Sequence, residues 1–237
     1  MKYLTLLFLF FATTLVLGQE NFTVADSLLL GRYALAAQGE DFQLQPEAAK
    51  AFTAMRKAAL NDSIRINVVS SFRSYSSQKR IWNRKYKRFV ASGMSPAAAI
   101  EKIIEYSTLP GTSRHHWGTD IDLVLGNVEV EGDILSEAHF HDGGAFEKLR
   151  LWLEKNAATY GFVLVYTRDN SRKGFFYEPW HYSYAPLSKA YLKQYRERNL
   201  LQKMAQDTTI LGHQYLSKSF MEKYYNANVL GINPTLK

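Results

Sequence analysis

The stretch from Ser113 to Asp122 constrains this chain more than any other, because it joins candidate metal ligands to a strand through a glycine. His115 and Asp122 stand seven residues apart, and Gly118 lies between them. Imidazole nitrogens and carboxylate oxygens are both ligands that Zn²⁺ accepts in proteins. The stretch therefore supplies two candidate metal ligands.

Residues 119–125 alternate between polar and apolar side chains, which is typical of a half-buried strand. Successive side chains of a strand point to opposite faces, so Asp120 and Asp122 are expected on one face and the apolar residues on the other. Two acids on the open face of a buried strand are unfavourable unless a metal or a hydrogen-bond donor satisfies them. This is the first indication of a functional site.

The N-terminus predicts a secretory signal peptide, residues 1–18. A basic start is followed by an apolar run from Tyr3 to Leu17 and by small residues before a cleavage site after Gly18. The run is short for the ~20 residues that a membrane span needs, and no cysteine is present to carry a lipid. We expect an exported chain, periplasmic or extracellular and associated with the cell wall, with no stable membrane insertion after cleavage.

The amino-acid composition limits which metal ligands and which binding partners are expected. Without cysteine there are no disulfides or thiolate ligands, so any zinc site uses His, Asp and Glu. The formal charge of +7 favours an anionic neighbourhood such as a wall or membrane surface, and nucleic acid is not an expected partner of an exported protein. Apolar residues make up 46 % of the chain, which is ample for a core, and residues 19–237 are expected to form one domain.

The periodicity predicts an α+β fold, with helices packed on a central antiparallel sheet whose open face holds the metal. Strands are expected at residues 64–69, 119–125, 128–130, 162–166 and 175–182. Helices are expected from Pro46 to about 60, from Ser76 or Ser77 to about 90, from Pro96 to about 106, and over 146–160, 188–198, 201–204 and 219–225. The core is expected over about 45–200, followed by a helical C-terminal extension.

The predicted helix 76–91 combines an apolar stripe with a run of cations. Its Lys and Arg residues are Lys79, Arg80, Arg84, Lys85, Lys87 and Arg88. They would suit an acidic polymer, but a solvated helix face is the favoured interpretation.

A catalytic zinc ion takes three protein ligands and leaves one position open, so a third ligand is needed. The candidates are another acid or one of the remaining histidines: His116, His139, His141, His181 and His213. His181 is the best candidate because Glu178, three residues earlier, would supply a base beside a ligand. The pair requires a kink in the strand, which Pro179 permits. We expect His116 to pack or to face solvent, and His139 and His141 to be exposed.

These motifs resemble a known family. Ser113-x-His115-x-x-Gly118-x-x-x-Asp122, followed by Glu178-x-Trp180-His181, resembles the zinc-dependent D-alanyl-D-alanine carboxypeptidases and dipeptidases, which share a fold with lysostaphin-type endopeptidases and the hedgehog domain. Ser71-Phe72-Arg73-Ser74-Tyr75 with Gln78 resembles part of the family's Ser-x-Tyr-Arg-Ser-x-x-x-Gln block, with Phe72 in place of tyrosine. The three blocks occur in the expected order.

The resemblance implies a role for each matching residue. His115, Asp122 and His181 match the ligands of one Zn²⁺ per chain. Glu178 matches the general acid and base, and Arg73 matches the residue that stabilises the oxyanion. Ser113 and Gln78 match positions near the substrate, and Asp120 and Trp180 are further candidates for substrate binding. Asp120 departs from the family, since many relatives carry alanine there; it would orient a ligand histidine or alter the charge of the pocket.

The resemblance implies an exported zinc carboxypeptidase that hydrolyses the terminal D-Ala-D-Ala bond of peptidoglycan stem peptides. An L,D-carboxypeptidase or a peptidoglycan endopeptidase would use the same site, and nothing in the sequence separates these activities. A non-catalytic, zinc-containing wall-binding module is less favoured, because the chain keeps both Glu178 and Arg73. The sequence does not indicate the oligomeric state.

Overall fold

The computed structural model describes residues 26–36, 39, 41–198, 200–205 and 207–237. The signal peptide predicted for residues 1–18 lies outside the described residues. Within the described part, no helix combines the length and the apolar character that crossing a membrane requires.

Four antiparallel strands form the central sheet in the order β1-β2-β4-β3. They are β1 (Ile66–Ser70), β2 (Asp120–Leu125), β3 (Phe162–Leu164) and β4 (His181–Tyr184). Strand β2 lies inside the sheet, so both of its edges are paired. The predicted α+β architecture is confirmed.

Helices surround the sheet, and several have a proline as their first or second residue, where its fixed φ suits the first turn. In chain order they are α1 (Asp26–Leu29), α2 (Pro46–Asn61), α3 (Tyr75–Ala91), α4 (Pro96–Ile103), α5 (Glu147–Asn156), α6 (Ala185–Glu197), α7 (Leu200–Ala205) and α8 (Lys218–Tyr224). A 3₁₀ turn, Ala157–Tyr160, extends α5 to Gly161, whose φ of +79° ends the helical segment as the sequence predicted.

Two strand predictions are wrong. Residues 128–130 form no strand, and both edges of β2, the strand just before them, are already paired with β1 and β4. The predicted strand 175–182 begins only at His181. Before it the backbone turns, with the amide of His181 donating to the carbonyl of Glu178, and Phe175 is buried in a helical core. The alternation of aromatic residues before His181 therefore reflects their burial and not strand pairing.

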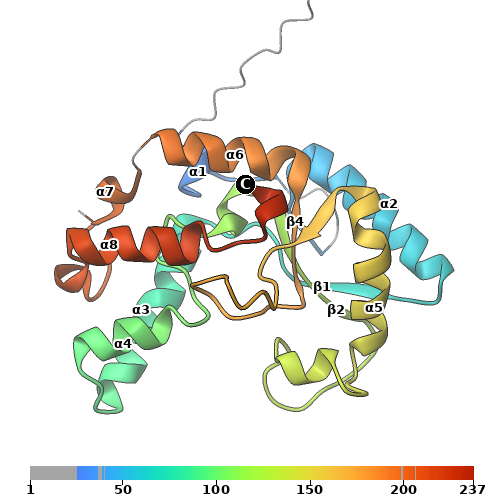
Figure 1. Cartoon of the computed structure of the whole chain (residues 1–237), viewed down its shortest axis with the longest axis horizontal. Helices are drawn as coiled ribbons and strands as arrows, with labels where there is room; N and C mark the ends of the chain where they lie inside the picture. The colour runs from blue at the N-terminus through green and yellow to red at the C-terminus, as the bar shows by residue number, and fades with distance from the viewer. Residues whose placement is uncertain (1–25, 37–38, 40, 199, 206) are drawn as a thin grey trace, which may run out of the picture.

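The two faces of the sheet have opposite character. Helices α2 and α5 cover one face, where Phe52 and Leu153 lie in the same core as Ile121, Leu123 and Tyr182. Figure 1 shows these helices on one side of the sheet, with α3, α4 and α8 on the other. The period of two sends the neighbouring polar residues of β2 and β4 to the opposite face.

A second core joins the remaining helices to each other. It contains large side chains from α3, α4, α6 and α8, including Trp82, Ile100, Tyr195 and Tyr224. The hydroxyl of Tyr224 accepts a hydrogen bond from the amide of Leu109, 3.0 Å away, which ties the loop after α4 to α8. A cleft lies between this helical part and the open face of the sheet.

Candidate metal centre

A short 3₁₀ turn, Arg114–Trp117, presents His115 to the open face of the sheet. Gly118 ends the turn with a φ of +66°, in the left-handed region that favours glycine, and β2 follows. Nδ1 of His115 lies 2.7 Å from the carbonyl oxygen of Ser71, which only accepts, so Nδ1 carries the proton. Nε2 points toward β2 and lies 3.3 Å from Oδ2 of Asp122.

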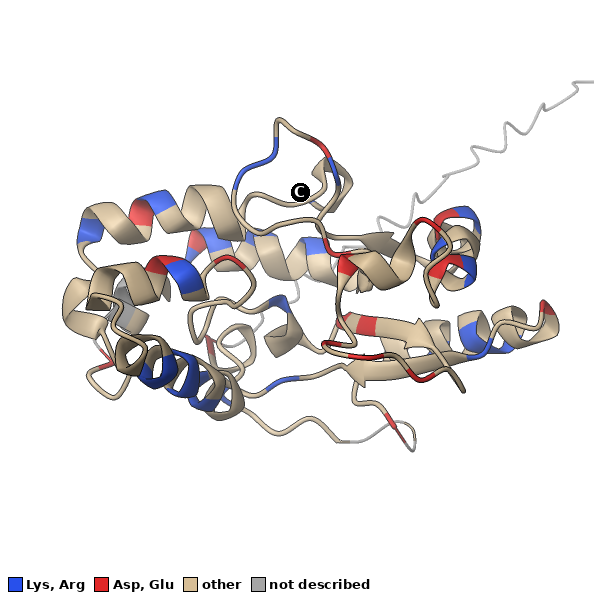
Figure 2. Cartoon of the chain, turned by 90° about the horizontal axis from the view of Figure 1, so that it is seen from below, with Lys and Arg blue, Asp and Glu red and all other residues tan. Residues whose placement is uncertain are grey.

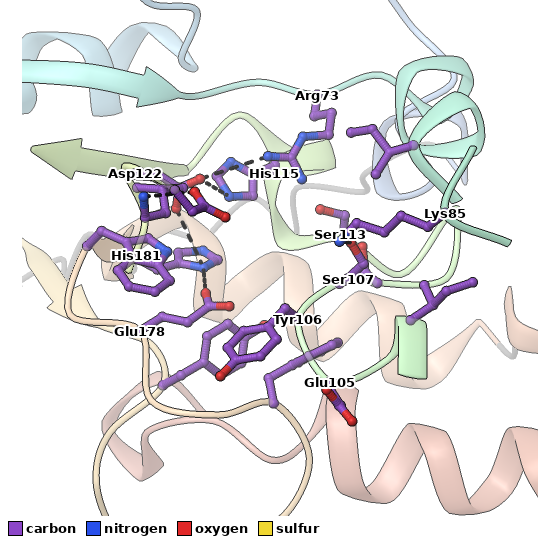
Figure 3. Close-up of a pocket in the computed structure, with 18 of the residues that line it drawn as sticks. Arg73, Lys85, Glu105, Tyr106, Ser107, Ser113, His115, Asp122, Glu178 and His181 are labelled. Carbon is purple, nitrogen blue, oxygen red and sulfur yellow. Dashed lines mark hydrogen bonds and ion pairs between the residues drawn. The ribbon is translucent and has the colours of Figure 1, made fainter. Parts of the chain in front are cut away.

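Strand pairing brings His181 to the same place. His181 is paired directly with Asp122, and directly opposed residues share a face of the sheet. Nδ1 of His181 lies 3.8 Å from Oδ1 of Asp122, and its ring centroid is 4.7 Å from that of His115. Figure 3 shows the three side chains converging from the 3₁₀ turn, β2 and β4.

These residues fit a metal ion. One ligand atom from each of His115, Asp122 and His181 lies within 4.8 Å of the others, and all three residues are buried. Oδ1 of Asp122 is buried without a hydrogen-bond partner, which is unfavourable for a carboxylate unless a cation satisfies it. Two imidazole nitrogens and one carboxylate oxygen are a donor set of catalytic zinc. No other such group of three is found among the described residues.

The charges around the group favour ionised acids. Burial alone would raise the pKa of Asp122, but His115, His181 and Arg73 hold it below its ordinary value. For His181, burial opposes protonation, yet hydrogen bonds to Asp120 and Glu178 raise its pKa to about 10. Without a metal, the ring of His181 is therefore protonated on both nitrogens, and metal binding must release one of these protons.

Glu178 borders the group from the turn that precedes β4. Its Oε2 lies 2.9 Å from Nδ1 of His181, the nitrogen that faces Asp122. The amide of His181 donates to the carbonyl of Glu178 across Pro179, which is the kink that the sequence required. Glu178 is buried and still lines the cleft.

Arg73 approaches the group from the loop after β1. Its guanidinium donates to the side chains of Gln78, at 3.1 Å, and Ser70, at 2.6 Å. Its Nη2 lies 3.9 Å from Oδ2 of Asp122. Gln78 is buried and also donates to the carbonyl of Thr108, so it holds Arg73 and does not line the cleft.

His116 has a structural role that sequence analysis did not identify. It is fully buried, and burial lowers its pKa to about 3, so the ring is neutral. Nδ1 donates to the carbonyl of Arg73, 2.5 Å away, and Nε2 accepts from the amide of Gly111. Adjacent histidines thus fasten the loop that carries Arg73 to the turn that carries His115. In the sequence, only the adjacency of His115 and His116 indicated this structural role of His116.

The remaining candidates separate into two sets. Ser113 and Trp180 line the cleft, which has a volume of about 690 Å³, whereas Asp120 lies behind the metal group and is fully buried. His141 and His213 lie away from the group: His141 contacts the hydroxyl of Tyr177, and His213 the carbonyl of Ile210. His139, predicted to be exposed, has a ring nitrogen that is buried without a partner.

Helix α3 forms the opposite wall of the cleft with the loop after α4. Figure 2 shows its cations gathered along one helix. Most face solvent, as predicted, but Lys85 and Arg88 line the cleft. Nζ of Lys85 donates to Oγ of Ser107 at 2.7 Å, and burial lowers the pKa of Lys85. Among the described residues, no carboxylate lies within 4.0 Å of Lys85.

Comparison with known proteins identifies similar sequences. Residues 41–187 match the model of the family described as VanY, D-alanyl-D-alanine carboxypeptidase. A D-alanyl-D-alanine carboxypeptidase of Enterococcus faecalis is 26 % identical over 151 residues, which cover 63 % of this chain and 50 % of that protein. The chain thus matches about half the length of this curated relative.

Solved structures show the same fold. A mutant of the vancomycin resistance D,D-pentapeptidase VanY, in complex with Zn(II), has a TM-score of 0.52 and 22 % identity and covers 68 % of this chain and 84 % of its own. VanYB in complex with D-alanine-D-alanine has a TM-score of 0.51 and 21 % identity, over 74 % and 90 % of the two chains.

Proposed function

Because the chain belongs to the VanY family of D-alanyl-D-alanine carboxypeptidases, we propose that it removes the terminal D-alanine from peptidoglycan stem peptides with the aid of one zinc ion. His115, Asp122 and His181 are the proposed ligands. The observation that carries the proposal is that Glu178 and Arg73 flank this one buried group in a single cleft. Figure 3 shows them on opposite sides of it.

Zinc, when bound, supplies Lewis-acid chemistry, since it polarises a carbonyl oxygen and makes water more acidic. Glu178 provides the proton transfer. Its carboxylate borders the ligand atoms, with Oε2 2.9 Å from Nδ1 of His181, and it takes the proton of the attacking water. The same carboxyl then returns the proton to the leaving amine.

Arg73 stabilises the negative charge that develops on the carbonyl oxygen of the scissile bond. A guanidinium offers several N–H donors in one plane, and fixed donors stabilise such charge without reorganisation. Hydrogen bonds to Gln78 and Ser70 hold it in place before the substrate arrives. We assign Gln78 this supporting role, and Ser113 and Trp180 to the walls that contact the peptide.

We also propose that the enzyme acts outside the cytoplasmic membrane, on wall peptides. The signal-peptide pattern at residues 1–18 supports export. The cations Lys85 and Arg88 in the cleft suit a substrate with free carboxylates.

Mass spectrometry of digested muropeptides tests the proposal. Zinc-loaded protein is incubated with pentapeptide, tetrapeptide and cross-linked muropeptides. Loss of one D-alanine from the pentapeptide supports it. Loss only from the tetrapeptide would assign an L,D-carboxypeptidase, and cleavage only of cross-linked material an endopeptidase. No hydrolysis of any of them would contradict the proposal.

A further inference from the structure

Asp120 lies directly behind the metal group and is satisfied entirely by protein donors. Its side chain is fully buried, and it does not line the cleft. Oδ1 accepts from Nε of Arg114 at 2.9 Å and lies 3.1 Å from Nε2 of His181. Oδ2 accepts from the hydroxyls of Thr119 at 2.6 Å and Ser183 at 2.9 Å. No oxygen of Asp120 is left for a substrate.

We propose that Asp120 is a positioning residue that fixes the tautomer and the ring orientation of the ligand His181. The carboxylate is paired with a buried guanidinium, so it acts only as an acceptor, and Nε2 of His181 must carry a proton to bond it. The lone pair of the neutral ring then resides on Nδ1, which faces Asp122 and Glu178. A carboxylate behind a ligand histidine also makes that histidine a stronger donor to the metal.

The surrounding contacts support a role for the whole arrangement in shaping the site. Arg114 precedes the ligand His115, Asp120 is two residues before the ligand Asp122, and Ser183 is two residues after His181. Nη2 of Arg114 donates to Ser183 at 2.7 Å. The polar network therefore connects the three segments that carry the ligands.

A structural ion pair is the alternative explanation. Asp120 would then serve only to neutralise Arg114, which is buried beside the ring of Trp117, 4.8 Å from its centroid. The two explanations differ at His181. Among the described residues, Asp120 is the only acceptor found for Nε2 of His181. Positioning predicts a change in metal affinity when Asp120 loses its charge, whereas a pure ion pair predicts a change in stability alone.

Zinc affinity of Asp120→Asn, measured by competition with a chromophoric chelator, tests the inference. Asparagine keeps the shape and one acceptor oxygen but removes the charge. We expect affinity to fall by about 10- to 100-fold, as is usual for the partners of ligand histidines. Asp207→Asn is the matched control, because it makes the same change in a hydrogen-bonded carboxylate, the partner of the Tyr75 hydroxyl, that does not line the cleft. It should lower the melting temperature and leave zinc affinity within about twofold of wild type.

The inference rests on the proposed zinc site, and different results would contradict the proposed function and the positioning role of Asp120. If the wild-type protein binds no zinc, the proposed function fails. If wild type binds zinc and Asp120→Asn binds it equally well, only the positioning role fails. Should Asp120→Asn not fold, nitrogen NMR of zinc-loaded wild type decides. A protonated Nε2 and a metal-bound Nδ1 on His181 are expected, and metal on Nε2 would overturn the inference.

Discussion

The two walls of the cleft are built in opposite ways. On the sheet side, His115, Asp122 and His181 are buried, and their geometry is fixed by strand pairing and hydrogen bonds. On the helical side, Lys85 and Arg88 project from α3, and the hydroxyl of Ser107 is the one hydrogen-bond partner of Lys85 among the described residues. The first wall is arranged before any ligand arrives. The second carries charge that a ligand must satisfy.

This difference separates chemistry from recognition. Buried, fixed groups change the energy of a transition state, because they need no reorganisation when charge develops. Partly exposed cations are screened by water and salt, so they contribute modestly to binding and to the rate of encounter. Substitutions in the sheet wall should therefore change zinc affinity and kcat. Substitutions in the α3 wall should change KM.

The largest effect is expected for Asp122→Asn. The variant loses a charged ligand, and its zinc affinity should fall by more than about 100-fold, beyond the range seen for residues that only support a ligand. Competition with a chelator measures this. Asp133→Asn, an exposed residue lining the same cleft, is the control and should bind zinc as wild type does. Equal zinc affinity in both variants would contradict the assignment of zinc binding to the sheet wall.

Arg73→Met should lower kcat by about 100- to 1,000-fold, the usual cost of removing one donor to an oxyanion. KM should change little, because Arg73 acts mainly in the transition state. Steady-state kinetics on a pentapeptide separates the two constants, and zinc content serves as the control. A rise in KM with kcat retained would show that Arg73 binds the substrate and does not stabilise the transition state.

A smaller effect is expected for Lys85→Met. The loss of one partly exposed cation should raise KM for an anionic peptide by about fivefold, equivalent to roughly 1 kcal/mol, and leave kcat unchanged. The difference from wild type should shrink at high salt. Lys87→Met, on the solvent side of α3, should leave KM as in wild type. Equal KM values for the two variants would show that Lys85 does not recognise substrate.

Local patterns predicted the elements that the site depends on. The alternation in residues 119–125 correctly placed Asp120 and Asp122 on the open face and Ile121 in the core, because pleating follows from the backbone alone. Prolines marked the starts of α2 and α4 for a similarly local reason.

Long-range partners could not be read in the same way. The pairing of His181 with Asp122 joins segments 59 residues apart. Nearby Glu178 made His181 the best candidate for the third ligand and the family resemblance agreed, but neither predicted the strand pairing itself. The contacts of Asp120 involve Arg114 and Ser183, whose meeting depends on how the strands and the 3₁₀ turn pack. Aromatic alternation before His181 predicted a strand wrongly, because burial in a loop produces the same pattern.

The central claim is that Glu178 performs the proton transfer at a zinc site, and Glu178→Ala tests it most directly. Release of D-alanine from purified pentapeptide muropeptides and zinc content are measured on the same samples. Glu105→Gln is a control from the same cleft: among the described residues Glu105 forms an ion pair only with Lys102, at 2.7 Å, and the variant should behave as wild type. Glu178→Ala should keep its zinc and its fold while its activity falls by at least about 100-fold. Hydrolysis at the wild-type rate would contradict the account.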